Sequence, residues 1–95
     1  MTQEELLDKV MVGLDKIPPH LRDTIRIHMD DILLDMIDSG VPTTLIDLEK
    51  DFIDRKCLGA VVRGVADVWN HGNSDTKVSE YYRQRVDKLR GKSHG

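Results

Sequence analysis

Apolar residues recur at every third or fourth position along most of the chain, which is the spacing of one buried face of an α-helix. The repeat is clearest in residues 6–17, 21–36 and 78–89. It predicts an all-α protein, a compact bundle of four to five short helices that forms a single domain over residues 1–91. Residues 92–95 are expected to be a flexible basic tail.

Capping residues set the ends of the first two predicted helices. Thr2 and Glu5 have the spacing of a capping box, and Pro18 stops the helix that follows, because proline excludes its preceding residue from the α conformation. The second helix is expected to span residues 19–38, with a proline in its first turn. Gly40 then ends this helix in the left-handed conformation that glycine adopts without strain.

The middle of the chain favours a third helix that begins at Leu45, after a turn at Val41-Pro42. Either Thr43 or Thr44 is expected to cap it. Its apolar face is expected to contain Leu45, Leu48, Phe52 and Ile53.

Residues 57–70 carry two conflicting signals. Gly59 and Gly64 each disfavour a helix by about 1 kcal/mol relative to alanine, and the adjacent valines between them suit a strand. The apolar residues nevertheless recur at helical intervals, so we interpret the segment as a helix with a break or bend near Gly59. The last helix is expected to follow a turn and a cap at Ser74 or Asp75.

The composition is typical of a soluble globular domain. The chain has 95 residues, of which 39% are hydrophobic and 33% are charged. No apolar run approaches the roughly 18 residues that cross a bilayer, and the first residues lack the basic and apolar regions of a signal peptide. Because Cys57 is the single cysteine, we expect a buried thiol without a disulfide and a reducing, cytoplasmic location.

Charge is distributed unevenly along the chain. The net charge of −3 combines −8 on residues 1–54 with +5 on residues 55–95. Halves of opposite sign indicate either a surface for a charged partner or mutual attraction inside one small fold.

The segment His28–Asp38 holds four aspartates and a histidine in eleven residues. Helical spacing places them on the flanks of the polar side of the second helix, so a solvated face is the more common outcome than a metal site. A metal site would need carboxylates from a further element, such as Asp47, Asp51 and Asp54 of the predicted third helix. We predict no metal, no cofactor, no catalytic residue and no small-molecule substrate.

Two aliphatic residues, Ile27 and Leu34, lie in the middle of that polar side, between the aspartates. A helix that is apolar on both sides is either wedged between layers or offers a second interface. We therefore predict a non-enzymatic interaction protein that binds a partner protein and changes its activity, as an adaptor, an inhibitor or an immunity protein does. The expected contact residues are Ile27, Asp30, Asp31, Leu34, Asp35, Asp38, Asp47 and Asp51.

Two variants of this hypothesis stay open. In the first, the acidic side of the predicted helices mimics the phosphates of DNA and binds to the DNA-binding surface of a partner protein. In the second, the chain forms a homodimer, because so small a domain gains stability when it buries more apolar surface.

The alternative hypothesis is a transcriptional regulator that binds nucleic acid. It uses the basic last helix, or a helix-turn-helix over residues 45–68 whose turn falls near residues 57–59. The expected contact residues are Arg55, Lys56, Arg63, Tyr81, Arg83, Arg85, Lys88 and Arg90.

Overall fold

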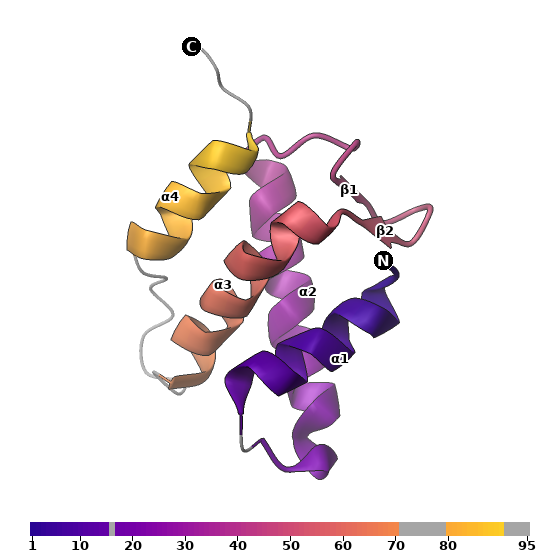
Figure 1. Cartoon of the computed structure of the whole chain (residues 1–95), viewed down its shortest axis with the longest axis vertical. Coiled ribbons are helices and arrows are strands. Elements are labelled where there is room, and N and C mark those ends of the chain that lie inside the picture. The colour runs from indigo at the N-terminus through magenta and orange to yellow at the C-terminus, as the bar shows by residue number, and fades with distance from the viewer. Residues whose placement is uncertain (16, 71–79, 91–95) are drawn as a thin grey trace.

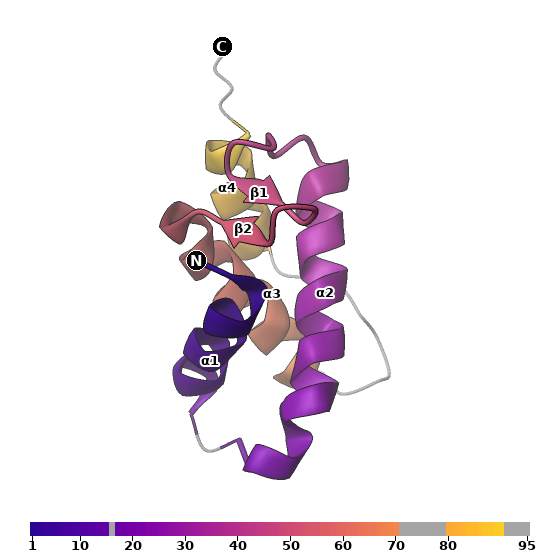
Figure 2. The same cartoon turned by 90° about the vertical axis from the view of Figure 1, so that its right-hand side faces the viewer.

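Four α-helices make up most of residues 1–15, 17–70 and 80–90, the parts of the chain that the computed structural model describes. The helices are α1 (Gln3–Leu14), α2 (Arg22–Asp38), α3 (Leu58–Asn70) and α4 (Glu80–Leu89). Two short 3-10 helices, η1 (Pro19–Leu21) and η2 (Arg55–Cys57), lead directly into α2 and α3. The predicted all-α class and the bundle of short helices are confirmed (Figures 1 and 2).

The predicted start of the first helix and the predicted end of the second are confirmed, whereas α1 ends at Leu14, before the predicted stop at Pro18, with Asp15 at a φ of 59°. The amide of Glu5 donates to Oγ1 of Thr2 at 3.1 Å, and the amide of Thr2 donates back to Oε1 of Glu5 at 2.8 Å, which completes the capping box. At the end of α2, Gly40 has a φ of 109°, a conformation that side chains rarely adopt. The second helix begins as η1 at Pro19 and becomes α-helical at Arg22.

The core is centred on α3, which packs against α1, α2 and α4 (Figure 1). Gly64 allows the close approach, because a Cβ atom there would lie 2.9 Å from both Ile32 Cδ1 on α2 and Tyr82 Cε1 on α4. Every helix contributes buried side chains, among them Leu6, Leu7, Val10, Ile25, Met29, Ile32, Leu33, Met36, Val61, Val65, Tyr82 and Val86. Each aliphatic side chain of this kind stabilises the fold by about 2 kcal/mol.

The helix predicted to begin at Leu45 is wrong. Strands β1 (Ile46–Asp47) and β2 (Phe52–Ile53) form a small antiparallel hairpin there, with Ile46 opposite Ile53. Both isoleucines are buried, whereas Phe52 is 39% exposed. Two aspartates shape the turn: Oδ1 of Asp47 accepts from the Lys50 amide at 3.2 Å, and Asp51 has a φ of 54°. Aspartate tolerates this left-handed conformation better than most residues.

The start of the chain holds the hairpin in place. Met1 exchanges two backbone hydrogen bonds of 2.8 Å with Ile53, so it pairs with β2 on the side away from β1. The amide of Gln3 donates to Oδ1 of Asp51 at 2.8 Å. The N-terminus lies beside β2 in both views (Figures 1 and 2). These contacts join positions about fifty residues apart, which no local pattern in the sequence contains.

Residues 58–70 form one continuous helix, which decides between the helix and the strand that the sequence left open. The expected break near Gly59 corresponds to the junction between η2 and α3. Asp54 begins this unit, because its Oδ1 accepts from the Lys56 amide at 2.8 Å. The predicted caps at Ser74 and Asp75 and the basic tail at 92–95 lie outside the described residues.

Candidate functional site

The outer side of α2 carries two exposed aliphatic residues among aspartates, and we name it the acidic face. The face consists of Asp23, Ile27, Asp30, Asp31, Leu34 and Asp38. Ile27 is 61% exposed and Leu34 is 51% exposed. Because the opposite side of α2 packs against α3, the acidic face points away from the body of the bundle.

None of the four aspartates of the acidic face forms an ion pair within the described part of the chain. The two arginines at the start of α2 are engaged elsewhere. Arg22 pairs with Glu4 and Asp8 at 2.7 Å each, and Arg26 pairs with Glu4 at 2.8 Å. The hydrogen bonds from Arg26 and then Arg22 lower the pKa of Glu4. The arginines of α2 therefore form their ion pairs with α1, and no ion pair of the described residues involves the acidic face.

Three of the aspartates predicted to contact a partner have roles inside the fold. Asp35 accepts a hydrogen bond of 2.7 Å from the hydroxyl of buried Tyr82, which joins α2 to α4. Burial, together with this bond to Asp35, raises the pKa of Tyr82 well above its usual value, so the phenol stays protonated. Asp47 and Asp51 belong to the hairpin and shape its turn. Of the predicted contact residues, Ile27, Asp30, Asp31, Leu34 and Asp38 are exposed on α2, and Asp51 is exposed on the hairpin.

The histidine of the acidic segment has an aromatic neighbour. His28 lies edge-on to Trp69 of α3, with ring centroids 6.4 Å apart. Among residues 1–15, 17–70 and 80–90, no three His, Cys, Asp or Glu side chains come together in an arrangement that could hold a metal ion.

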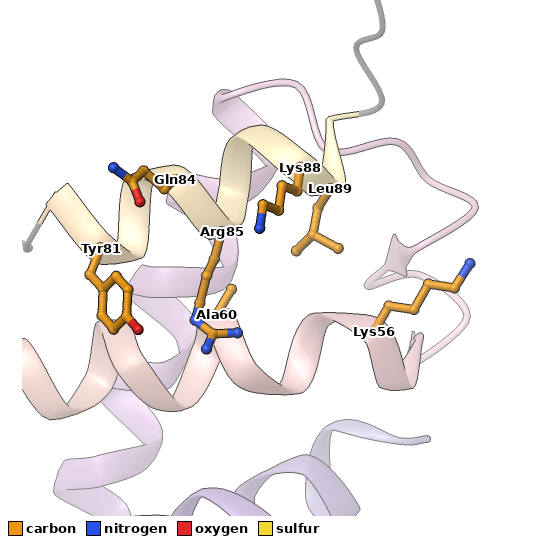
Figure 3. A pocket seen from close by; sticks show the side chains of 7 residues that line it. All are labelled: Lys56, Ala60, Tyr81, Gln84, Arg85, Lys88 and Leu89. Atoms are coloured by element: carbon orange, nitrogen blue, oxygen red, sulfur yellow. The ribbon is translucent and has the colours of Figure 1, made fainter.

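A second charged surface lies between α4 and the start of α3, and we name it the basic groove (Figure 3). It is a hollow of about 330 Å³, open to solvent, and it is lined by Lys56, Ala60, Tyr81, Gln84, Arg85, Lys88 and Leu89. Tyr81, Arg85 and Leu89 point from α4 toward α3, while Lys56 projects from η2 at one end. No carboxylate of the described residues lines the groove, whereas three of the residues that do line it are cationic.

Tyr81 is the aromatic residue of the groove, and it is 58% exposed. The guanidinium carbons of Arg63 and Arg85 lie 5.8 and 5.7 Å from its ring centroid, within the range of cation–π contacts. Arg63 also pairs with Asp67 at 3.2 Å. Arg85 has no carboxylate partner among the described residues, and it reaches across to lie over Gly59.

The structure divides the eight residues that were predicted to contact nucleic acid. Lys56, Tyr81, Arg85 and Lys88 line the basic groove, and Arg63 contacts its tyrosine. Arg83 and Arg90 lie on the opposite flank of α4, beside the carboxylates of Asp35 and Asp87. Arg90 pairs with Asp87 at 3.0 Å. Arg55 is exposed on η2 and does not line the groove.

The helix-turn-helix expected over residues 45–68 is wrong. Residues 46–53 contain the hairpin, so the first helix of such a motif is absent, and α3 has no helical partner before it in the sequence at that spacing. Arg63 therefore projects from the middle of α3 toward Tyr81 of α4 and is not part of a helix-turn-helix motif.

Sequence reasoning missed the second wall of the groove. The repeat of Tyr81, Arg85 and Lys88 along one flank of α4 was visible, and Gln84 lies on the same flank. That Lys56 and Ala60 would face this flank depends on how η2 and α3 pack against α4, and no sequence spacing indicates it.

The thiol of Cys57 is buried, and its Sγ lies 3.8 Å from the carbonyl oxygen of Leu45. Burial, and secondarily the charge of Asp54, raises the pKa of Cys57 to about 11. A thiol with this pKa is protonated at neutral pH and is a poor nucleophile.

Comparison of the chain with protein-family models, with curated proteins and with solved structures finds no match. Of the helices in the described ranges, none has the length and apolar character that a bilayer crossing requires. The functional argument therefore depends on the two charged surfaces alone.

Proposed function

We propose that the protein is a small non-catalytic regulator that docks its acidic face on a partner protein with a basic surface and so changes the activity of that partner. The single observation that carries the proposal is the exposure of Ile27 and Leu34, 61% and 51%, in the middle of four aspartates that form no ion pair with the described residues. Burial of aliphatic side chains under a partner stabilises the complex, and the surrounding negative charge increases the rate at which a basic partner associates.

The distribution of charge favours a partner of a different kind over a second copy of the chain. A twofold dimer on the acidic face would bring the aspartates of both copies together, and like charges at an interface oppose association. A basic partner removes this repulsion. A DNA-binding protein is a partner of this class, since its binding surface is built to receive rows of negative charge. With one buried cysteine, the chain suits a reducing compartment such as the cytoplasm.

The experiment is an affinity capture from lysate followed by a binding titration with the captured protein. The double variant Ile27→Asp with Leu34→Asp should bind roughly a hundredfold more weakly, because two covered aliphatic residues contribute roughly 1.5 kcal/mol each. Val12→Asp is the matched control for Ile27→Asp, because Val12 is a helical aliphatic residue that is 80% exposed on α1. The control should bind as the natural chain does, and circular dichroism should give the same helical content for all variants.

The role of the aspartates is tested separately. Asp30→Asn with Asp31→Asn should slow association several-fold at low salt and change the dissociation rate little, because solvated charges act mainly on the encounter. Equal binding by the natural chain and the Ile27→Asp, Leu34→Asp variant would overturn the proposal. It would also be overturned by sedimentation showing a dimer that the same double variant converts to monomer, since a second copy would then cover the face.

A further inference from the structure

The basic groove is a second surface whose charges the fold leaves unbalanced. Three cationic side chains, Lys56, Arg85 and Lys88, reach it from two different elements, and none of the described residues that line it is a carboxylate. The opposite flank of α4 differs, because its arginines lie beside carboxylates. One helix therefore has a flank with balanced charge and a flank with uncompensated positive charge.

Arg85 carries its charge from α4 across to α3. A Cβ atom on Gly59 would lie 2.8 Å from Nη1 of Arg85, so the guanidinium lies directly on the first turn of α3. Arg85 and Lys88 of α4 and Lys56 of η2 line the same hollow, so an anion bound there would offset the repulsion between their charges. The groove is thus complementary to a negatively charged ligand.

The other lining residues narrow the class of anion. Tyr81 offers an exposed aromatic ring beside the cations, Gln84 offers an amide that can donate and accept, and guanidinium planes lie near the ring. Bases of single-stranded nucleic acid stack on aromatic rings and on guanidinium planes while the backbone follows cationic side chains. An acidic peptide would use the charges but has no need for the ring. A duplex is too wide to enter a hollow between two packed helices.

We propose that the basic groove binds single-stranded nucleic acid, with Lys56, Arg85 and Lys88 on the phosphates and Tyr81 against a base. Binding is weak and insensitive to sequence, because a hollow of about 330 Å³ holds only a short stretch of strand. The proposal is independent of the acidic face, which lies on the side of α2 that points away from α3.

The test is a fluorescence-anisotropy titration of the full chain with labelled oligothymidylate and oligouridylate at 50 and 200 mM salt. Three phosphate contacts give a slope of about −2 for log K against log salt, so binding should weaken about 15-fold between these concentrations. Arg85→Gln with Lys88→Gln should weaken binding at 50 mM salt and reduce the salt effect to about threefold, the value for one remaining contact. Lys56→Gln, on the other wall, should lower the slope by about 0.7.

The matched control is Arg83→Gln with Arg90→Gln, which removes the same charge from the same helix on the opposite flank. This variant should bind within about twofold of the natural chain, because only the groove contacts phosphate. Equal losses in the two double variants would overturn the groove as the site and leave only a general effect of net charge. Absence of binding at 50 mM salt would overturn the proposal outright.

Competitors separate the sources of negative charge. Unlabelled oligonucleotide should displace the probe, whereas polyglutamate of equal charge should compete at least tenfold less well. Equal competition by polyglutamate would mean that the groove receives an acidic protein segment, and the nucleic-acid proposal would then be wrong. Tyr81→Leu should weaken oligonucleotide binding without a change in the salt slope, since it removes the stacking surface and no charge.

Discussion

The two sides of α4 are built from the same kinds of residue and have opposite surroundings. Tyr82 is buried, its ring lies against Gly64 of α3, and its hydroxyl donates to Asp35 of α2. Tyr81, the preceding residue, is 58% exposed and lies in a groove that no carboxylate of the described residues lines. On the first side packing dictates the shape and the polarity of each side chain. On the second side, the positive charges of Lys56, Arg85 and Lys88 form no ion pair that would stabilise the described part of the fold.

Because of this difference, substitutions on the buried side of α4 should change stability, whereas substitutions on the groove side should change binding. A substitution on the buried side changes how α2, α3 and α4 fit together, and it acts on the free energy of unfolding. A substitution of Arg85 or Lys88 on the groove side removes an exposed charged side chain, so it should leave the free energy of unfolding within about 0.5 kcal/mol of its natural value. The following predictions test how sharply the two sides differ.

The largest effect is expected from Gly64→Leu. A Cβ atom at this position already meets the ring of Tyr82 and the side chain of Ile32 at 2.9 Å, and the ring is held at its hydroxyl. The larger side chain should lower the free energy of unfolding by about 3 kcal/mol. Urea denaturation followed by circular dichroism measures this change. Gly59→Ala is the control and should stabilise by about 0.5 kcal/mol, because alanine favours the helix and the guanidinium of Arg85 can move aside.

The next effect is a loss of stability at alkaline pH that depends on Cys57. Its pKa in the folded protein is about 11, against an ordinary value of 9.0, so between these values the unfolded chain releases a proton that the folded chain keeps. Stability is therefore complete below pH 9 and should fall by about 2 kcal/mol between pH 9 and pH 11. Cys57→Ala should remove this part of the slope in urea titrations at several pH values. The raised pKa of Tyr82 adds a second loss in the same direction. An identical slope in the alanine variant would contradict the assignment.

The smallest effect distinguishes the neighbouring tyrosines. Tyr82→Phe removes the hydroxyl that donates to Asp35 at 2.7 Å and should lower the free energy of unfolding by about 1.5 kcal/mol. Tyr81→Phe removes an exposed hydroxyl and should change it by less than about 0.5 kcal/mol. Thermal melts of both variants at neutral pH measure the difference. Equal shifts would mean that the hydrogen bond to Asp35 contributes nothing to stability.

The sequence indicates α2 well because a helix of 17 residues repeats its apolar face several times. The hairpin is a different case. Its apolar residues at positions 45, 48, 52 and 53 also suit a helix, and the backbone is decided by Asp51 at positive φ and by pairing with Met1. The pairing of Met1 with Ile53 joins chain segments that meet only in the folded protein, so a local sequence pattern cannot predict it.

The two surfaces differ in the same way. The acidic face lies on one helix, so its periodicity placed Ile27 and Leu34 correctly on the side opposite the core. The basic groove has walls from two elements, and the sequence grouped its α4 residues with Arg83 and Arg90, which lie on the opposite flank. Asp35 looked like part of the acidic face, because nothing in its spacing shows that the hydroxyl of Tyr82 reaches it.

The basic groove depends on the packing of α4 against α3, because α4 forms one of its walls. Of the described residues, α4 buries Tyr82 and Val86, whereas α2 buries five side chains, so α4 is the helix whose detachment costs less free energy. When α4 detaches, the groove loses one wall, while the acidic face on α2 is unchanged. A ligand in the groove would therefore slow the exchange of α4 amide protons with solvent, and a partner on the acidic face would have no such effect. Local opening of one helix would make the two surfaces separately controllable in a chain of 95 residues.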